Sequence, residues 1–221
     1  MKLRKINYIL AMALLVSSIS ASAVNVYADT INNINSRAII TDSVVIDKED
    51  SGSTLVPGDI LEEVKSGTGS ITIQASKFIE EGSVFSIERD EEAIRVTKEN
   101  LKKFNCNNVT LLEGDAIEHM ESLSKEIKEE KISKFDSIFI GGSGGGLEKI
   151  INISDEILKE DGVLVLNFIT LNNAYNAIEF LKKLEYKTEI SLVNISKNRE
   201  NTYMMISNNP IFIVKAFKEE N

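Results

Sequence analysis

From Pro57 onward the sequence alternates between short apolar runs, typical of buried strands, and longer segments with helical spacing. Strands that alternate with helices favour right-handed βαβ units and a parallel sheet covered on both faces. We therefore predict an α/β fold with a doubly wound, mostly parallel sheet. The expected strands span residues 59–64, 83–87, 109–113, 135–140, 163–169, 187–195 and 211–217, and the expected helices span 71–79, 91–104, 116–128, 147–158 and 171–184.

The first expected strand–turn–helix unit contains a glycine turn, Ser66-Gly67-Thr68-Gly69. Glycine lets the backbone approach a ligand closely, and the free N–H groups at the start of the following helix face such a ligand. The turn is therefore a candidate nucleotide cradle. An ordinary βα turn with two glycines would have the same sequence pattern.

The second expected strand, 83–87, is followed directly by Glu88. Nucleotide-binding α/β folds hold ribose hydroxyls with an acidic residue at this place. A carboxylate suits this task because it accepts hydrogen bonds from both hydroxyls of a vicinal diol. The spacing between the glycine turn and Glu88 predicts a nucleotide-type ligand whose ribose is bound by Glu88.

The N-terminal part of the chain differs from the rest. Residues 1–28 combine a basic start, the apolar run Tyr8–Val16 and small residues ending in Ala28, which is typical of a secretory signal peptide. A buried or amphipathic N-terminal helix is the alternative. We interpret residues 29–54 as a polar arm or linker in which Ile39-Ile40 and Val44-Val45-Ile46 could form a short strand, and 55–221 as one α/β domain.

Charge and metal-ligand content exclude several functions. The net charge of −9 argues against a nucleic-acid partner, because phosphate binding needs a basic face. The single cysteine, Cys106, allows no intramolecular disulfide, and with one histidine, His119, we expect no metal site. We expect His119 to lie on a helix surface.

Four motifs together resemble the class I S-adenosylmethionine-dependent methyltransferases. They are residues 63–69, Ile87-Glu88, Glu113-Gly114-Asp115-Ala116 and the strand end with its glycine loop, 138–145. The Ile-Gly-Gly-Ser-Gly-Gly sequence of the last motif resembles the CbiT-type decarboxylating precorrin methyltransferases. The resemblance extends from about Leu55 to Lys218.

This resemblance implies a class I sheet with an antiparallel strand near the C-terminus, S-adenosylmethionine as cofactor and a tetrapyrrole substrate. The implied reaction methylates C15 of a precorrin or cobalt-precorrin with decarboxylation of the C12 acetate, in the cytoplasm, by a homo-oligomer (a tetramer). No catalytic base is identified. The implied cofactor-binding residues are Glu63, Gly67, Gly69, Glu88, Asp115 and Ala116, and the implied substrate-binding residues are Gly141, Gly142, Ser143, Gly144, Gly145, Asn167 and Thr170.

Several of these assignments have structural alternatives. Asp115 could simply favour a helix N-terminus through the helix dipole, and Asn167 and Thr170 could be a satisfied polar pair at a strand end. Lys65 stands where the family has glycine, and the N-terminal segment differs from the family pattern. The alternative function is therefore a non-catalytic methyltransferase-fold protein, which the signal-like segment would export.

Overall fold

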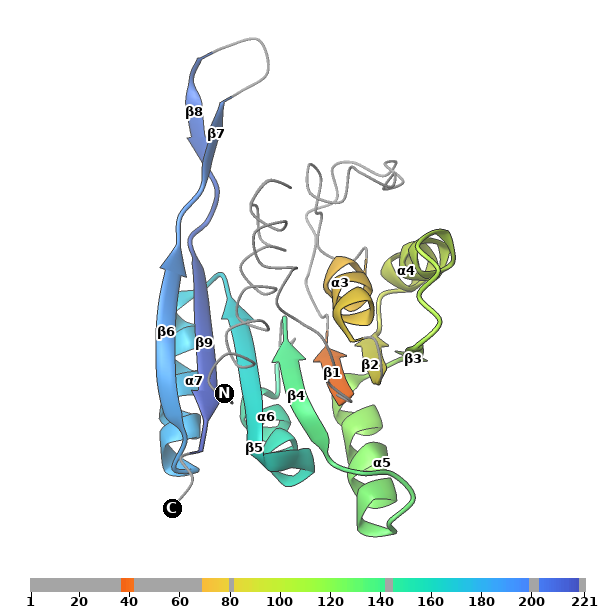
Figure 1. Ribbon diagram of the computed structural model, residues 1–221. Coiled ribbons are helices and arrows are strands. Elements are labelled where there is room, and N and C mark those ends of the chain that lie inside the picture. The colour runs from red at the N-terminus through yellow and green to blue at the C-terminus, as the bar shows by residue number, and fades with distance from the viewer. Residues whose placement is uncertain (1–36, 42–68, 80–81, 142–144, 199–202, 219–221) are drawn as a thin grey trace.

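The computed structural model describes residues 37–41, 69–79, 82–141, 145–198 and 203–218. Their main feature is a seven-stranded sheet in the order β3-β2-β1-β4-β5-β9-β6 (Figure 1). Only β9 runs antiparallel to its neighbours, β5 and β6. The predicted α/β class, the mostly parallel sheet and the antiparallel strand near the C-terminus are confirmed. The strands are β1 (Arg37–Thr41), β2 (Ser83–Glu88), β3 (Val109–Glu113), β4 (Phe135–Ile140), β5 (Leu158–Phe168), β6 (Lys187–Val193) and β9 (Ile211–Phe217).

The described helices cover both faces of the sheet. Helices α5, α6 and α7 lie on one face, and α3 lies with α4 near β1 and β2 on the other face (Figure 1). The larger apolar core packs α5, α6 and α7 against the sheet, whereas a smaller cluster joins Ile71 and Ala75 of α3 to the opposite face. The helices are α3 (Ser70–Phe78), α4 (Glu91–Lys103), α5 (Ala116–Lys128), α6 (Leu147–Ile157) and α7 (Leu171–Lys183).

The strand between β2 and β4 comes from an unexpected part of the sequence. Arg37–Thr41 pairs in parallel with both β2 and β4, so the interpretation of this stretch as an arm or linker does not apply to it. Its β-branched residues favour a strand, and a central position lets the backbone pair on both sides. The short strand left open at Ile39-Ile40 is thus present. The strand expected over 59–64 lies outside the described residues.

Two further differences concern the second half of the chain. Strand β5 begins at Leu158 rather than near 163, with a register shift against β4 at its start. The loop expected between the last two strands contains a small hairpin of β7 (Ser196–Asn198) and β8 (Met205–Ser207), which projects beyond the sheet in Figure 1. Its residues are largely exposed and polar residues surround it, so the sequence offers little apolar alternation to reveal it.

The predicted signal-like segment, 1–28, lies outside the described residues, and so do the limits predicted for the arm and the domain. Within the described part of the chain, no helix is long and apolar enough to cross a membrane.

Candidate cofactor and substrate site

The candidate site lies at the edge of the sheet where the parallel strands end. Strand β1 is flanked by β2 on one side and β4 on the other, so the chain moves outward in both directions from this point. In open α/β sheets, ligands bind beyond the carboxyl ends of the strands at such a topological switch point. Residues that follow β2, β3, β4 and β5 are therefore brought to one edge.

Glu88 ends β2 and is only 6% exposed. Its Oε1 accepts hydrogen bonds from the backbone N–H groups of Arg89, at 2.7 Å, and Asp90, at 2.9 Å. Burial raises the pKa of the Glu88 carboxyl, although these two N–H donors act in the opposite direction. Because both donors use Oε1, no described residue donates to Oε2, whose lone pairs suit a ligand hydroxyl.

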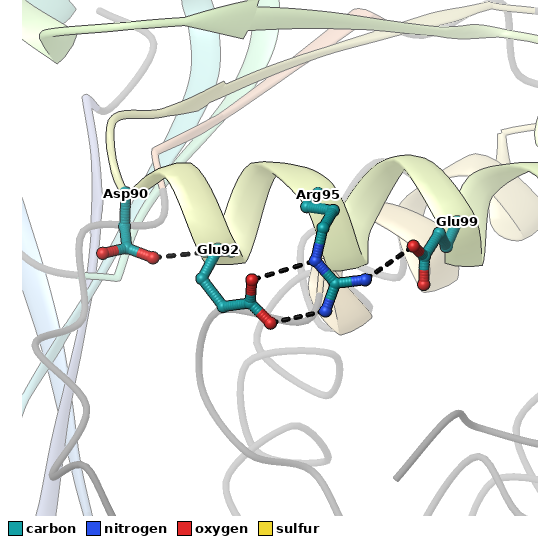
Figure 2. A network of polar contacts seen from close by, with 5 residues as sticks. Asp90, Glu92, Arg95 and Glu99 are labelled. Carbon is teal, nitrogen blue, oxygen red and sulfur yellow. Dashed lines mark hydrogen bonds and ion pairs between the residues drawn. The ribbon is translucent and has the colours of Figure 1, made fainter. Parts of the chain in front are cut away.

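The start of α4 holds the Glu88 turn in place. Asp90 is the N-cap of this helix and accepts a hydrogen bond from the N–H of Ala93 at 2.8 Å. Figure 2 shows Arg95 between Glu92 and Glu99, bonding to both carboxylates on the exposed side of α4. Such exposed pairs contribute little individually. We therefore assign the Arg95 pairs to the helix surface and Asp90 to the geometry of the site.

The turn after β3 lies beside Glu88. Glu88 and Glu113 are register partners, and the N–H of Gly114 donates to the Glu88 carbonyl at 2.8 Å. Asp115 is exposed and caps α5, since its Oδ1 accepts from the N–H groups of Ile117 and Glu118. Asp115 therefore has the structural role that the sequence left open for it, at the N-terminus of a helix. Ala116 is the first residue of α5 and is half-buried.

Gly69 precedes α3 and requires a left-handed backbone. Its φ is +70°, and a Cβ at this position would lie 2.6 Å from Cγ2 of Thr97 on α4. Thr97 is 3% exposed, so the start of α3 packs tightly on α4. The other residues predicted in this turn, Glu63 and Gly67, lie outside the described residues, as does Lys65.

The glycine loop after β4 is described at its two ends. Gly141 follows β4 directly, while Gly142, Ser143 and Gly144 lie outside the described residues. Gly145 and Gly146 have φ values of +97° and +75°, and Gly146 is the N-cap of α6. Among the described atoms, none lies within 4 Å of a Cβ built at Gly145.

Asn167 and Thr170 lie at the end of β5, one strand beyond the glycine loop. Asn167 is half-buried and pairs in register with Ile213 of β9. Thr170 is exposed and is the N-cap of α7, without a side-chain capping bond. The fold thus places these two residues on the same edge of the sheet as Gly141.

Two side-chain contacts at this edge are not predicted by the sequence. Thr97 fills the space beside Gly69, and Nε2 of His119 lies 3.0 Å from the carbonyl oxygen of Glu113. The apolar periodicity of α4 does not single out Thr97, because its contact is with the start of another helix, α3. The spacing of Asp115 and His119, one helical turn apart, was the only available signal for His119. Across the described ranges, no group of three or more potential ligands could hold a metal ion.

Comparisons with known proteins identify the family of this chain. A model of the precorrin methyltransferase domain matches residues 53–206. A protein of Sulfurisphaera tokodaii named probable cobalt-precorrin-6B C(15)-methyltransferase (decarboxylating) is 39% identical over 171 residues, covering 76% of this chain and 84% of that protein.

Two solved structures are similar over most of their length. The precorrin-6y C5,15-methyltransferase of Geobacter metallireducens has a TM-score of 0.66 and 31% identity, covering 89% of this chain and 86% of the other. The precorrin 8W decarboxylase of Methanobacterium thermoautotrophicum has a TM-score of 0.61 and 28% identity, covering 82% and 81%. With a class I methyltransferase sheet and a family match over most of its length, this chain belongs to the precorrin methyltransferase family.

Proposed function

We propose that this protein transfers a methyl group from S-adenosylmethionine to C15 of a precorrin or cobalt-precorrin and removes the carboxyl group of the C12 acetate. The observation that carries this proposal is the family match over residues 53–206, which includes Glu88, the Glu113–Ala116 turn and the glycine loop after β4. The non-catalytic alternative rests on Lys65 and the N-terminal segment alone, and nothing in the comparisons supports export. We place the activity in the cytoplasm and expect no nucleic-acid partner, given the net charge of −9.

The cofactor is assigned to the edge formed by β1, β2 and β3. Glu88 would accept the ribose hydroxyls through Oε2, and Asp115 with Ala116 would lie beside the adenine. Two observations support placing the ribose and adenine sites side by side. Glu88 is buried, and the N–H of Gly114 donates to the Glu88 carbonyl, which holds the ends of β2 and β3 together. The remaining cofactor positions, Glu63, Gly67 and Gly69, would lie beside the methionine part.

The substrate is assigned to the adjoining edge, from the glycine loop to β5. Residues 141–145 lack large side chains, which leaves room for a bulky macrocycle and lets backbone N–H groups approach its carboxylates. Asn167 and Thr170 would contact the same molecule from the end of β5. The lack of any described atom within 4 Å of a Cβ built at Gly145 supports this assignment.

In this reaction an electron pair of the macrocycle forms a bond from C15 to the sulfonium methyl carbon. The sulfur–methyl bond breaks and its electrons stay on sulfur, giving S-adenosylhomocysteine. The bond to the acetate carboxylate breaks separately, which releases carbon dioxide and leaves an electron pair that takes up a proton. The ring system, which becomes positively charged on methylation, releases one proton in exchange, so that charge balances. The protein's contribution is mainly to align the two reactants and to stabilise developing charge.

The full chain should transfer radiolabelled methyl from S-adenosylmethionine to cobalt-precorrin-6B, releasing one S-adenosylhomocysteine and one carbon dioxide per methyl. Calorimetry with S-adenosylhomocysteine alone separates cofactor binding from turnover. Cofactor binding without binding of any tetrapyrrole would overturn the corrin assignment and leave a methyltransferase with another substrate. A chain that binds neither ligand would instead be the non-catalytic form.

We further propose that the protein is a homo-oligomer assembled through β6 and the β7–β8 hairpin. In the described sheet β6 is an edge strand that pairs only with β9. Ile190 and Leu192 on β6 are each 55% exposed, and Met204, Met205 and Ile206 in and beside the hairpin are 48–65% exposed. Exposed apolar side chains on an edge strand favour association with another protein surface. A second copy of this chain agrees with the tetramer implied by the family resemblance.

The double variant Leu192→Glu/Met205→Glu should reduce the mass in solution to that of one chain, because buried charges of one sign without partners are costly at an interface. Light scattering coupled to size exclusion measures this mass. The control is Lys125→Glu, a charge reversal on the exposed side of α5. An unchanged mass for the double variant would exclude this edge as the interface.

A further inference from the structure

We propose that His119 is a positioning residue for the adenine side of the cofactor site, an inference that rests on the proposed function. His119 lies on α5, one turn after Asp115. The sequence interpretation placed it on a helix surface. The contacts of its ring instead lead to the turn that carries Asp115 and Ala116.

The imidazole ring bonds to the backbone of that turn. Nε2 of His119 lies 3.0 Å from the carbonyl oxygen of Glu113. A carbonyl oxygen only accepts, so Nε2 carries the hydrogen and donates, an assignment made from the bond rather than from an observed proton. The helix that follows the turn therefore reaches back to hold the last residue of β3.

The same ring occupies the space above Gly114. Gly114 has a φ of +138°, a backbone conformation that side chains rarely adopt, and a Cβ there would lie 3.1 Å from Nε2 of His119. The missing side chain of Gly114 thus gives the imidazole its place. His119 therefore holds the carbonyl of Glu113 through a hydrogen bond and fills the space beside Gly114.

The turn at Glu113 and Gly114 is also bonded to Glu88, on the ribose side of the site. The N–H of Gly114 donates to the carbonyl of Glu88, and Nζ of Lys98 on α4 pairs with Glu113 Oε1 at 2.5 Å. The turn is consequently held by α5 through His119, by α4 through Lys98 and by β2 through Glu88. Of these three, the His119 contact is the one made from the helix that begins with Asp115 and Ala116.

Loss of the His119 contact should alter ligand recognition more than folding. The Asp115 capping bonds to Ile117 and Glu118 do not involve the imidazole, so α5 keeps its start. The ring is only half-buried, so its removal exposes little apolar surface. The turn itself, however, loses a donor and a steric neighbour, which widens the range of positions open to Asp115.

The test compares His119→Leu, which keeps bulk without a donor, with His119→Gln, whose amide N–H can still donate. Calorimetry on the full chain measures binding of S-adenosylhomocysteine and of S-inosylhomocysteine, which lacks the adenine amino group. His119→Leu should weaken S-adenosylhomocysteine binding by about three- to tenfold, the loss typical of one neutral hydrogen bond, and His119→Gln should stay within about twofold of the parent. The preference for adenine over hypoxanthine should fall in the Leu variant.

A purely structural histidine would give a different pattern. Equal losses for both ligands, equal losses in Leu and Gln variants, or no loss in either variant would each overturn this inference while leaving the proposed function standing. A parent chain that binds neither nucleoside ligand would overturn the proposed function and this inference with it. Glu121→Gln is the matched control, since it changes an exposed residue of the same helix whose described partner is Lys149 of α6; its effect should stay below about twofold.

Discussion

Replacing Glu88 by alanine is expected to weaken binding of S-adenosylmethionine and of S-adenosylhomocysteine by about 1.5–3 kcal/mol, the range for hydrogen bonds to a charged group. The reason lies in the position of the carboxylate. Glu88 is buried at the end of β2, with Oε1 held by two backbone N–H groups and Oε2 directed to no described donor. Calorimetry on the purified chain measures the change.

The matched control for Glu88→Ala is Glu92→Ala. Glu92 is an exposed carboxylate on the same helix–turn segment, and its described partner is Arg95 (Figure 2). The Glu92→Ala variant should bind the cofactor with an affinity within about twofold of that of the parent, because exposed pairs contribute little. Equal affinities for Glu88→Ala and the parent would show that another residue binds the ribose.

The raised pKa of Glu88 adds a dependence on pH. Ribose hydroxyls donate best to the ionised carboxylate, so cofactor affinity should fall as the pH decreases through the folded-state pKa, which lies above the ordinary value of about 4.3. For folding the sign is opposite: the stability from burying the neutral group is complete below the unfolded-state pKa and is lost as pH rises through the folded-state pKa. Glu88→Gln should remove this part of the pH dependence in both measurements.

Replacing Gly69 by alanine is expected to reduce the free energy of unfolding by about 2–5 kcal/mol. About 1–2 kcal/mol comes from the left-handed backbone at φ +70°, and about 1–3 kcal/mol comes from overpacking against Thr97. The new Cβ would lie 2.6 Å from Cγ2 and 2.8 Å from Oγ1 of Thr97. Denaturant unfolding followed by circular dichroism measures the change.

Two variants separate these contributions. Gly146→Ala introduces a Cβ at φ +75°, where the one described atom that it meets is Cδ1 at the far end of the Ile117 side chain, so its cost should be mainly that of the backbone. Thr97→Ala removes Cγ2 and Oγ1, so the Gly69→Ala/Thr97→Ala pair should recover the steric share of the loss but not the backbone share. Strict additivity of the two single changes would contradict the contact between α3 and α4.

The residues themselves determined much of this protein. Strand-like and helical runs alternate along the chain because each element buries one apolar face, and this pattern predicted the α/β class and most elements after residue 82. Glu88 could be predicted at a strand end because the carboxyl ends of parallel strands share one edge. Likewise, the position of Asp115 before a helix follows from local capping chemistry.

Tertiary structure decided what local patterns do not encode. Arg37–Thr41 became the strand between β2 and β4 because two parallel neighbours satisfy its backbone, whereas its five residues within a polar stretch indicated only a possible short strand. The contacts of Thr97 with Gly69 and of His119 with Glu113 depend on how helices α4 and α5 pack after the strands have paired. Sequence periodicity specifies which face of an element is buried, but the atom that a side chain meets there is set by the relative placement of whole elements.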